Sequence, residues 1–425
     1  MRAQLNAKPS IGVMDRCLVP LVRSRQLSYR IAHLRTGDPF FKVSNDYHPK
    51  PQQATIFSTF APHIQRRSTS HYAEQPAPTK RSPKALFRSG RLSIPSTYTR
   101  QTQLVRLALT QADPQSERRD LMFTLSDGRK LGYSEFGDPN GTPVFYFHGY
   151  IGARTEAIDW HETAKLLGVR IISLDRPGMD LSSFHPNRRI LDYPRDVREL
   201  ARHLRISKYF VCGVSSGGPY AIACAYAIPK EELLGSGVVA GMGPWPMGTS
   251  KMMISSKFMF NAMKHAPLLW RWVIDKVYVP VFQDPNPKAR TKFWKMTTKR
   301  MNDEDRAVLE QDKAVKVLLE TAVEGFRQGS DGYMQEGELM TSNWGFRLED
   351  VDSNKIILWY GTEDRNAPCD GGEFMAERLP NAEYVGFEGE SHFTLVEKHC
   401  ERILGELVSG QVVPSQSPHC NTIHD

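Results

Sequence analysis

Residues 213–217, with the sequence GVSSG, form the pattern in this chain that is most easily linked to chemistry. They follow the apolar run 209–214 and precede a stretch of small residues, which predicts a tight turn between a strand and a helix. Three interpretations are open: a phosphate-binding loop, a close-packing turn, or a turn that exposes Ser215 as a nucleophile. The segment lacks the GK[ST] ending and the G-x-G-x-x-G spacing of phosphate loops, so the first interpretation fits worst.

The glycine spacing gives the third interpretation a physical reason. In a G-x-S-x-G turn the serine backbone is strained, and side chains at the positions of Gly213 and Gly217 would clash. Such a turn places the Ser215 hydroxyl at the carboxyl edge of a sheet, at a helix N-terminus that favours negative charge. Because a serine hydroxyl is a weak nucleophile, it needs a base and a group that orients the base.

Two later segments supply such groups. The stretch ILWYGTEDRNAP runs from a predicted strand into Asp364, and VGFEGESHFTLVE runs from the last predicted strand into His392. The carboxyl ends of parallel strands share one edge of a sheet, so both side chains are predicted to lie near Ser215. The order serine, aspartate, histidine along the chain is the order expected of a triad on such a sheet.

An upstream segment is a candidate for stabilising negative charge. The predicted strand 144–148 ends in His148, and Gly149 follows it. Glycine lets the backbone turn its N–H groups toward the nucleophile, so the backbone N–H groups of Tyr150 and Ser216 are predicted to form an oxyanion hole. His148 is expected to be structural, because His392 already fills the role of base.

These groups need a sheet that brings distant loops together. Apolar β-type runs recur at 144–148, 169–175, 209–214, 233–241, 355–361 and 382–387, with helical segments between them. Runs without alternation are typical of strands buried on both faces, as in a parallel sheet covered by helices. A hairpin around Asp127-Gly128 precedes them. The predicted fold class is therefore α/β, with a doubly wound, mostly parallel sheet.

The motifs together identify a family. The segments HGYIGARTEA, LDRPGMDLSS, GVSSGGPYAIA, GTEDRNAP and GESHF resemble, in this order, those of the α/β-hydrolase fold superfamily. The resemblance covers residues from about 121 to 409. It implies a serine hydrolase with a Ser215–His392–Asp364 triad, a helical cap, and no metal or organic cofactor.

The resemblance also bears on neighbouring charged residues. Family spacing favours Asp364 over Glu363 as the triad acid. Asp180 departs from the pattern, because it stands where family members often have glycine. Asp175, which ends a predicted strand beside Arg176, is expected to form an ion pair within the chain that braces the loop.

The resemblance and the composition divide the chain into four regions. These are a basic, low-complexity, disordered N-terminal extension at 1–118, a hydrolase core at 119–241 and 347–410, a helical cap insertion at 242–346, and a C-terminal tail at 411–425. The cap is rich in Met and Trp, which is typical of side chains packed against the core. The alternative is that some of them line an apolar substrate pocket.

Charge and cysteine content exclude several protein classes. The first 100 residues hold seventeen Lys and Arg against four acids, so the basic character belongs to the extension, and no nucleic-acid motif is present.

The six cysteines form no metal or disulfide pattern, which is typical of reduced thiols in an intracellular, cytoplasmic protein. No apolar run is long enough to span a membrane. Six Arg in the first 36 residues are typical of a mitochondrial transit peptide, although Pro20 interrupts its helix.

The functional expectation is a hydrolase of small to medium apolar esters, thioesters or lactones that acts through an acyl-enzyme. Its partner is a small-molecule substrate, and the sequence carries no signal for an oligomeric state. One alternative keeps the triad for C–C bond, amide or lyase-type chemistry. Another is a non-catalytic binding protein on the same scaffold.

Overall fold

The structure is a computed structural model that describes residues 118–248, 250–299 and 301–413. Predictions for the N-terminal extension and the end of the C-terminal tail fall outside these residues. Eight strands form one sheet, in the order β1-β2-β4-β3-β5-β6-β7-β8. Their bounds are β1 Arg118–Thr124, β2 Lys130–Gly137, β3 Thr142–Phe147, β4 Val169–Leu174, β5 Tyr209–Val214, β6 Leu233–Val239, β7 Ile356–Gly361 and β8 Ala382–Phe387.

The sheet is mostly parallel, as predicted. β4, β3, β5, β6, β7 and β8 pair in parallel, while β2 is antiparallel to both β1 and β4. The β1–β2 hairpin turns through Asp127 and Gly128, where Gly128 has a φ of +87° that side chains rarely adopt. The predicted hairpin is confirmed.

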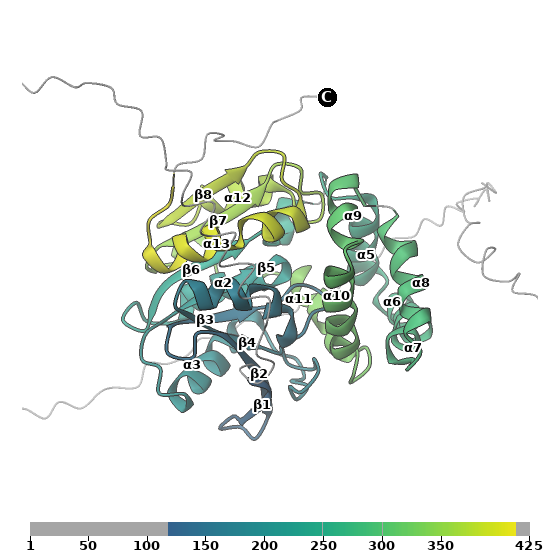
Figure 1. Ribbon diagram of the computed structural model, residues 1–425, viewed down its shortest axis with the longest axis horizontal. Helices are drawn as coiled ribbons and strands as arrows, with labels where there is room; N and C mark the ends of the chain where they lie inside the picture. Colours follow the sequence, from purple (N-terminus) through teal and green to yellow (C-terminus); the bar gives the residue numbers. More distant parts are fainter. Residues whose placement is uncertain (1–117, 249, 300, 414–425) are drawn as a thin grey trace, which may run out of the picture. The chain divides into compact units, whose positions relative to one another are not determined.

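Helices cover both faces of the sheet (Figure 1). η2 Arg154–Trp160, α2 His161–Leu166 and α13 His392–Ser409 pack on one face, and α3 Tyr193–His203, α4 Gly218–Ala227 and α12 Cys369–Ala376 pack on the other. Alternate residues of one strand enter different cores: Phe145 and Phe147 belong to one, Val144 and Tyr146 to the other. Burial on both faces explains why the strand sequences are continuously apolar.

A helical insertion separates β6 from β7. It comprises α5 Ile254–His265, α6 Pro267–Val273, η6 Ile274–Tyr278, α7 Val279–Gln283, α8 Pro287–Thr298, α9 Asp303–Leu309, α10 Asp312–Gly325 and α11 Asp331–Met340. Short turns η3 Ile190–Asp192, η4 Ser215–Gly217, η5 Trp245–Met247 and η7 Leu348–Asp350 complete the described elements. Figure 1 shows α10 between the sheet and the pair α6 and α8.

Two composition-based expectations can be compared with the structure. None of the helices in the described residues is long and apolar enough to cross a membrane. Cys212, Cys224 and Cys400 are free. Cys369 is disulfide-bonded, so the expectation that all six cysteines are reduced is wrong at this position.

Candidate active site

Ser215 lies at the sharp turn between β5 and α4. Its φ is +53°, in the left-handed region that residues with side chains rarely adopt. A Cβ atom at Gly213 would come within 2.2 Å of the Gly217 carbonyl oxygen, and one at Gly217 within 2.1 Å of the Phe147 carbonyl oxygen. Both glycines are therefore required by sterics, and the turn presents Ser215 at the carboxyl end of the parallel strands.

His392 and Asp364 meet at the same edge of the sheet. Asp364 follows β7, and His392 is the first residue of α13. The His392 Nδ1 and the Asp364 Oδ2 are 2.7 Å apart, and both residues are buried. The other carboxylate oxygen, Oδ1, accepts hydrogen bonds from the backbone N–H groups of Asn366 and Ala367. These bonds fix the carboxylate toward His392, whereas Glu363 is exposed to solvent.

The surroundings of His392 favour its protonated form. Burial lowers the pKa of the imidazole, but the charge of Asp364 and the hydrogen bond to it outweigh burial and raise the pKa above its usual value. Asp305 of α9 adds to this effect. Its Oδ1 also accepts hydrogen bonds from the Ser391 hydroxyl at 2.6 Å and the Phe393 backbone N–H at 2.8 Å. Asp305 thus joins the helical insertion to the start of α13.

The loop after β3 is oriented by the buried guanidinium of Arg176. Arg176 donates hydrogen bonds to the carbonyl oxygens of His148 and Gly149, the second at 2.8 Å, and to the Ser216 hydroxyl at 3.1 Å. The Gly149 C=O and the Tyr150 N–H belong to one trans peptide, in which these two groups point in opposite directions. The Tyr150 N–H is therefore directed away from Arg176, and no residue of the described chain accepts a hydrogen bond from it.

Glu156 holds the other side of this loop. The carboxylate accepts hydrogen bonds from the Gly149 backbone N–H at 2.9 Å and from the Tyr146 hydroxyl at 2.9 Å. Burial raises the pKa of this carboxyl group. A Cβ atom at Gly149 would lie 3.5 Å from both the Glu156 Oε2 and the Ser215 Cβ. Gly149 therefore brings the loop backbone directly against the serine.

Arg176 is itself held by the helical insertion. Its Nε lies 2.9 Å from the Glu336 Oε2 of α11, and both side chains are fully buried. The other Glu336 oxygen, Oε1, pairs with the guanidinium of Arg188 and accepts a hydrogen bond from the Tyr220 hydroxyl at 2.9 Å. Burial raises the pKa of Glu336, but the two arginines outweigh it and lower the pKa overall. The ion pair expected of Asp175 is present, but it is formed with a different arginine and not with the adjacent Arg176.

That arginine is Arg154. It pairs with Asp175 at 3.0 Å and with Asp180. The Asp180 backbone has a φ of +34°, which explains why glycine is common at this position in the family. The carboxylate of Asp180 also pairs with Arg327 of the helical insertion at 2.7 Å. The departure from the family pattern thus adds an ion pair between the core and the insertion.

His148 is held as a neutral ring. Its Nδ1 lies 2.9 Å from the Gly149 carbonyl oxygen, and its Nε2 accepts a hydrogen bond from the Arg176 backbone N–H at 3.3 Å. Burial and the neighbouring Arg176 lower its pKa well below the usual value. These contacts place His148 in the support of the loop.

Sequence reasoning did not find four charged residues that surround the site: Glu156, Arg176, Asp305 and Glu336. For Arg176 the sequence shows only that it follows Asp175. The signal for Glu156 was present in the segment HGYIGARTEA, seven residues after Gly149, but nothing in the spacing indicates which N–H the carboxylate accepts from.

Comparisons with known proteins agree with this architecture. The family model described as alpha/beta hydrolase fold matches residues 142–399, so the chain belongs to the α/β-hydrolase fold family. A curated relative from Leptolyngbya boryana, named "Probable proline iminopeptidase", is 31% identical over 117 residues. The match spans only 36% of that relative and 26% of this chain.

Solved structures are similar in fold. A hydrolase from Pseudomonas aeruginosa PA01 has a TM-score of 0.50 at 16% identity, covering 68% of this chain and 98% of that one. An enol-lactonase from Burkholderia xenovorans LB400 has a TM-score of 0.48 at 14% identity, covering 68% of this chain and all of that one. At this identity the likeness concerns the fold alone.

Proposed function

We propose that this chain is a serine hydrolase that cleaves small to medium apolar esters, thioesters or lactones. The observation that carries the proposal is the combination of Ser215 at φ +53° with the 2.7 Å contact between His392 and Asp364 at the same sheet edge. Membership of the α/β-hydrolase fold family supports it. The helical insertion between β6 and β7 would act as a cap over this edge.

The proposed reaction proceeds through an acyl-enzyme. His392 takes the Ser215 proton as the hydroxyl oxygen attacks the carbonyl carbon, and Asp364 stabilises the imidazolium that forms. The Tyr150 and Ser216 N–H groups hold the oxyanion. Collapse of the tetrahedral species expels the alcohol, which receives the proton from His392. Water, deprotonated by His392, then attacks the acyl carbon, and the acid is released as the Ser215 oxygen takes back the proton from His392.

The proposal of an apolar substrate rests on the side chains that surround Tyr150, in the loop after β3. The Tyr150 hydroxyl donates a hydrogen bond to the Tyr333 carbonyl oxygen at 3.0 Å, and its ring packs on Phe260 at 5.8 Å between centroids. Met263 lies against the same hydroxyl at 3.3 Å. Apolar side chains of the helical insertion packed beside Tyr150 support a substrate whose acyl group carries no charge.

A panel of p-nitrophenyl esters of graded chain length tests the function. We expect a pre-steady-state burst of p-nitrophenol equal to about one equivalent of enzyme, because p-nitrophenyl esters acylate a serine faster than the acyl-enzyme is hydrolysed. Ser215→Ala is the matched control and should give no burst. Wild-type protein that turns over no ester, thioester or lactone in the panel would contradict the proposal.

Amide hydrolysis is the second candidate, because the curated relative from Leptolyngbya boryana is named as a proline iminopeptidase. The same triad attacks esters and amides, so the residues do not separate the two activities. L-proline p-nitroanilide separates them. A kcat/KM on this substrate higher than on every ester of the panel would favour the peptidase assignment.

Ser216→Ala tests the division of roles between the two serines. The Ser216 hydroxyl accepts a hydrogen bond from Arg176, and alanine keeps the backbone N–H. We expect kcat to stay within about tenfold of wild type, since the backbone N–H remains and Arg176 keeps its hydrogen bond to the Gly149 carbonyl oxygen. Steady-state kinetics on the preferred ester provide the measurement. A loss equal to that of Ser215→Ala would contradict the assignment.

The pH dependence follows from the raised pKa of His392. The base must be neutral to accept the Ser215 proton, so kcat/KM is expected to rise with pH and to reach half of its maximum above about pH 6.5, the ordinary value for histidine. Asp364→Asn removes the charge that raises this pKa and should move the midpoint to lower pH. A midpoint that is unchanged in Asp364→Asn would contradict this account.

A further inference from the structure

The outer helices of the insertion expose large apolar side chains. α5 and α6 each bury one side: Phe260, Met263 and Trp270 are buried in the core. On the other side, five large apolar side chains are between 59% and 87% exposed: Ile254, Phe258, Leu268, Leu269 and Trp272. The rings of Phe258 and Trp270 meet edge to face at 6.1 Å, so α5 and α6 form one surface. Exposure of so many large apolar groups on neighbouring helices is typical of an interaction site.

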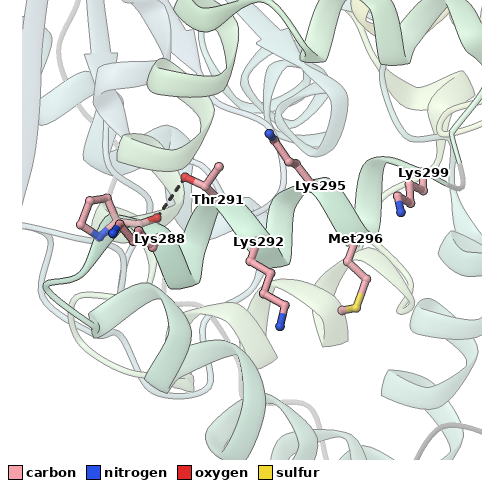
Figure 2. Close-up of a pocket in the computed structure, with 7 residues that line it drawn as sticks. Lys288, Thr291, Lys292, Lys295, Met296 and Lys299 are labelled. Carbon is pink, nitrogen blue, oxygen red and sulfur yellow. Dashed lines mark hydrogen bonds between the residues drawn. The ribbon is translucent and has the colours of Figure 1, made fainter. Parts of the chain in front are cut away.

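A row of lysines follows on α8. Lys288, Lys292, Lys295 and Lys299 are all exposed, and their spacing of four, three and four residues returns to the same face of a helix. Figure 2 shows them spread along α8, with Met296 beside them. No ion pair involves them within the described part of the chain. Like charges at such spacing destabilise a helix, and an anionic partner would relieve this cost.

The two features belong to one packed group of helices. Tyr278 of η6 contacts the ring of Trp270 at 6.3 Å and the ring of Phe293, from the buried side of α8, at 5.1 Å. Figure 1 shows α6 and α8 on the side of α10 that faces away from the sheet. We use the name insertion face for the five exposed apolar side chains of α5 and α6 together with the four lysines at 288–299.

Charge is segregated between this region and the rest of the chain beyond residue 100. Residues 251–299 contain ten Lys and Arg against two Asp and no Glu. Outside them, residues 101–250 and 300–425 contain 28 Lys and Arg against 41 Asp and Glu. A negatively charged surface therefore attracts the insertion face and repels residues 101–250 and 300–425, which favours one orientation of this part of the chain on that surface.

We propose that the insertion face docks on an anionic lipid bilayer. Exposed Trp, Phe and Leu beside lysines are the composition of helices that lie in a bilayer interface, with the rings at headgroup level and the lysines at the lipid charges. A second copy of the chain fits worse, since a symmetric contact would bring the lysine rows together. The chain's own first 100 residues fit worse for the same reason, because they are also basic. This inference does not depend on the proposed catalytic activity.

Co-sedimentation with lipid vesicles tests the proposal on the full chain. Vesicles of phosphatidylcholine with about a third of phosphatidylserine are compared with phosphatidylcholine alone. The variant Lys292→Gln/Lys299→Gln is expected to bind the anionic vesicles at least tenfold more weakly, since each lysine near such a surface contributes about fivefold. Lys165→Gln/Lys208→Gln removes two exposed lysines elsewhere and should bind within about twofold of wild type. The basic N-terminal residues are present in all variants, so their contribution cancels.

A second readout locates the contact. Brominated lipids should quench wild-type tryptophan fluorescence more strongly than that of Trp272→Phe, because Trp272 would lie at headgroup level. Equal binding of the two double variants would overturn the proposal, as would equal binding to neutral and anionic vesicles. So would a change of oligomeric state in Trp272→Ala, seen by sedimentation velocity, with vesicle binding unchanged, since the face would then be a contact between copies. Circular dichroism confirms that each variant keeps its helices.

Discussion

Replacing Ser215 with alanine is expected to lower kcat by about 10⁵-fold while leaving KM and Tm nearly unchanged. The substitution removes the only atom that bonds to the acyl group in the proposed mechanism. It leaves the turn between β5 and α4 intact, because alanine has a Cβ atom like serine and can adopt the same φ of +53° at the same cost. Stability should therefore change little, although the activity is lost.

Steady-state kinetics on the preferred ester, together with thermal denaturation, measure both effects. Ser216→Ala is the control, because it changes the neighbouring hydroxyl in the same turn. Retention of more than about one hundredth of the wild-type kcat by Ser215→Ala would contradict the proposed role, since such activity exceeds what binding and the oxyanion hole supply alone.

Replacing Gly217 with alanine is expected to destabilise the fold by about 3 kcal/mol or more. The added Cβ atom would lie 2.1 Å from the Phe147 carbonyl oxygen. That oxygen belongs to β3 in the middle of the sheet, so neither backbone segment can move away without disturbing strand pairing. Activity should fall as well, because displacement of β3 moves the loop at Gly149.

Gly405→Ala is the matched control for this effect. Gly405 lies inside α13, and a Cβ atom there meets no atom within 4 Å. Alanine favours the helix, so this variant should be more stable than wild type by up to about 1 kcal/mol. Urea denaturation gives both values. A Gly217→Ala protein as stable as wild type would show that the turn does not hold the close contact described here.

The parallel part of the sheet could be predicted from the sequence because its physics is local. Each strand is buried on both faces, so it forms a short continuous apolar run, and the helix that follows forms a separate pattern. The run predicted at 209–214 is β5 itself, and that predicted at 382–387 is β8. The need for glycine at 213 and 217 could be predicted for the same reason, because a steric clash in a tight turn depends on a few neighbouring atoms.

The charged support of the site could not be predicted, because it depends on contacts between distant segments. Arg176 and Glu336 are 160 positions apart in the chain, and their 2.9 Å contact exists only once α11 docks on the loop after β4. Adjacency suggested Asp175 as the partner of Arg176, but neighbouring side chains in an extended loop point in different directions. Asp305 is a similar case, since its bond to Ser391 depends on how α9 packs on α13.

The central claim of this account is that Ser215 is the nucleophile. Treatment with a fluorophosphonate probe, followed by mass spectrometry of the digested protein, tests it most directly, because the probe bonds only to a serine activated by a base. The account predicts about one label per chain, on Ser215, that is absent from Ser215→Ala and greatly slowed in an Asp364→Asn variant. Labelling of Ser215→Ala at the wild-type rate, or a label on another residue of the wild-type protein, would contradict it.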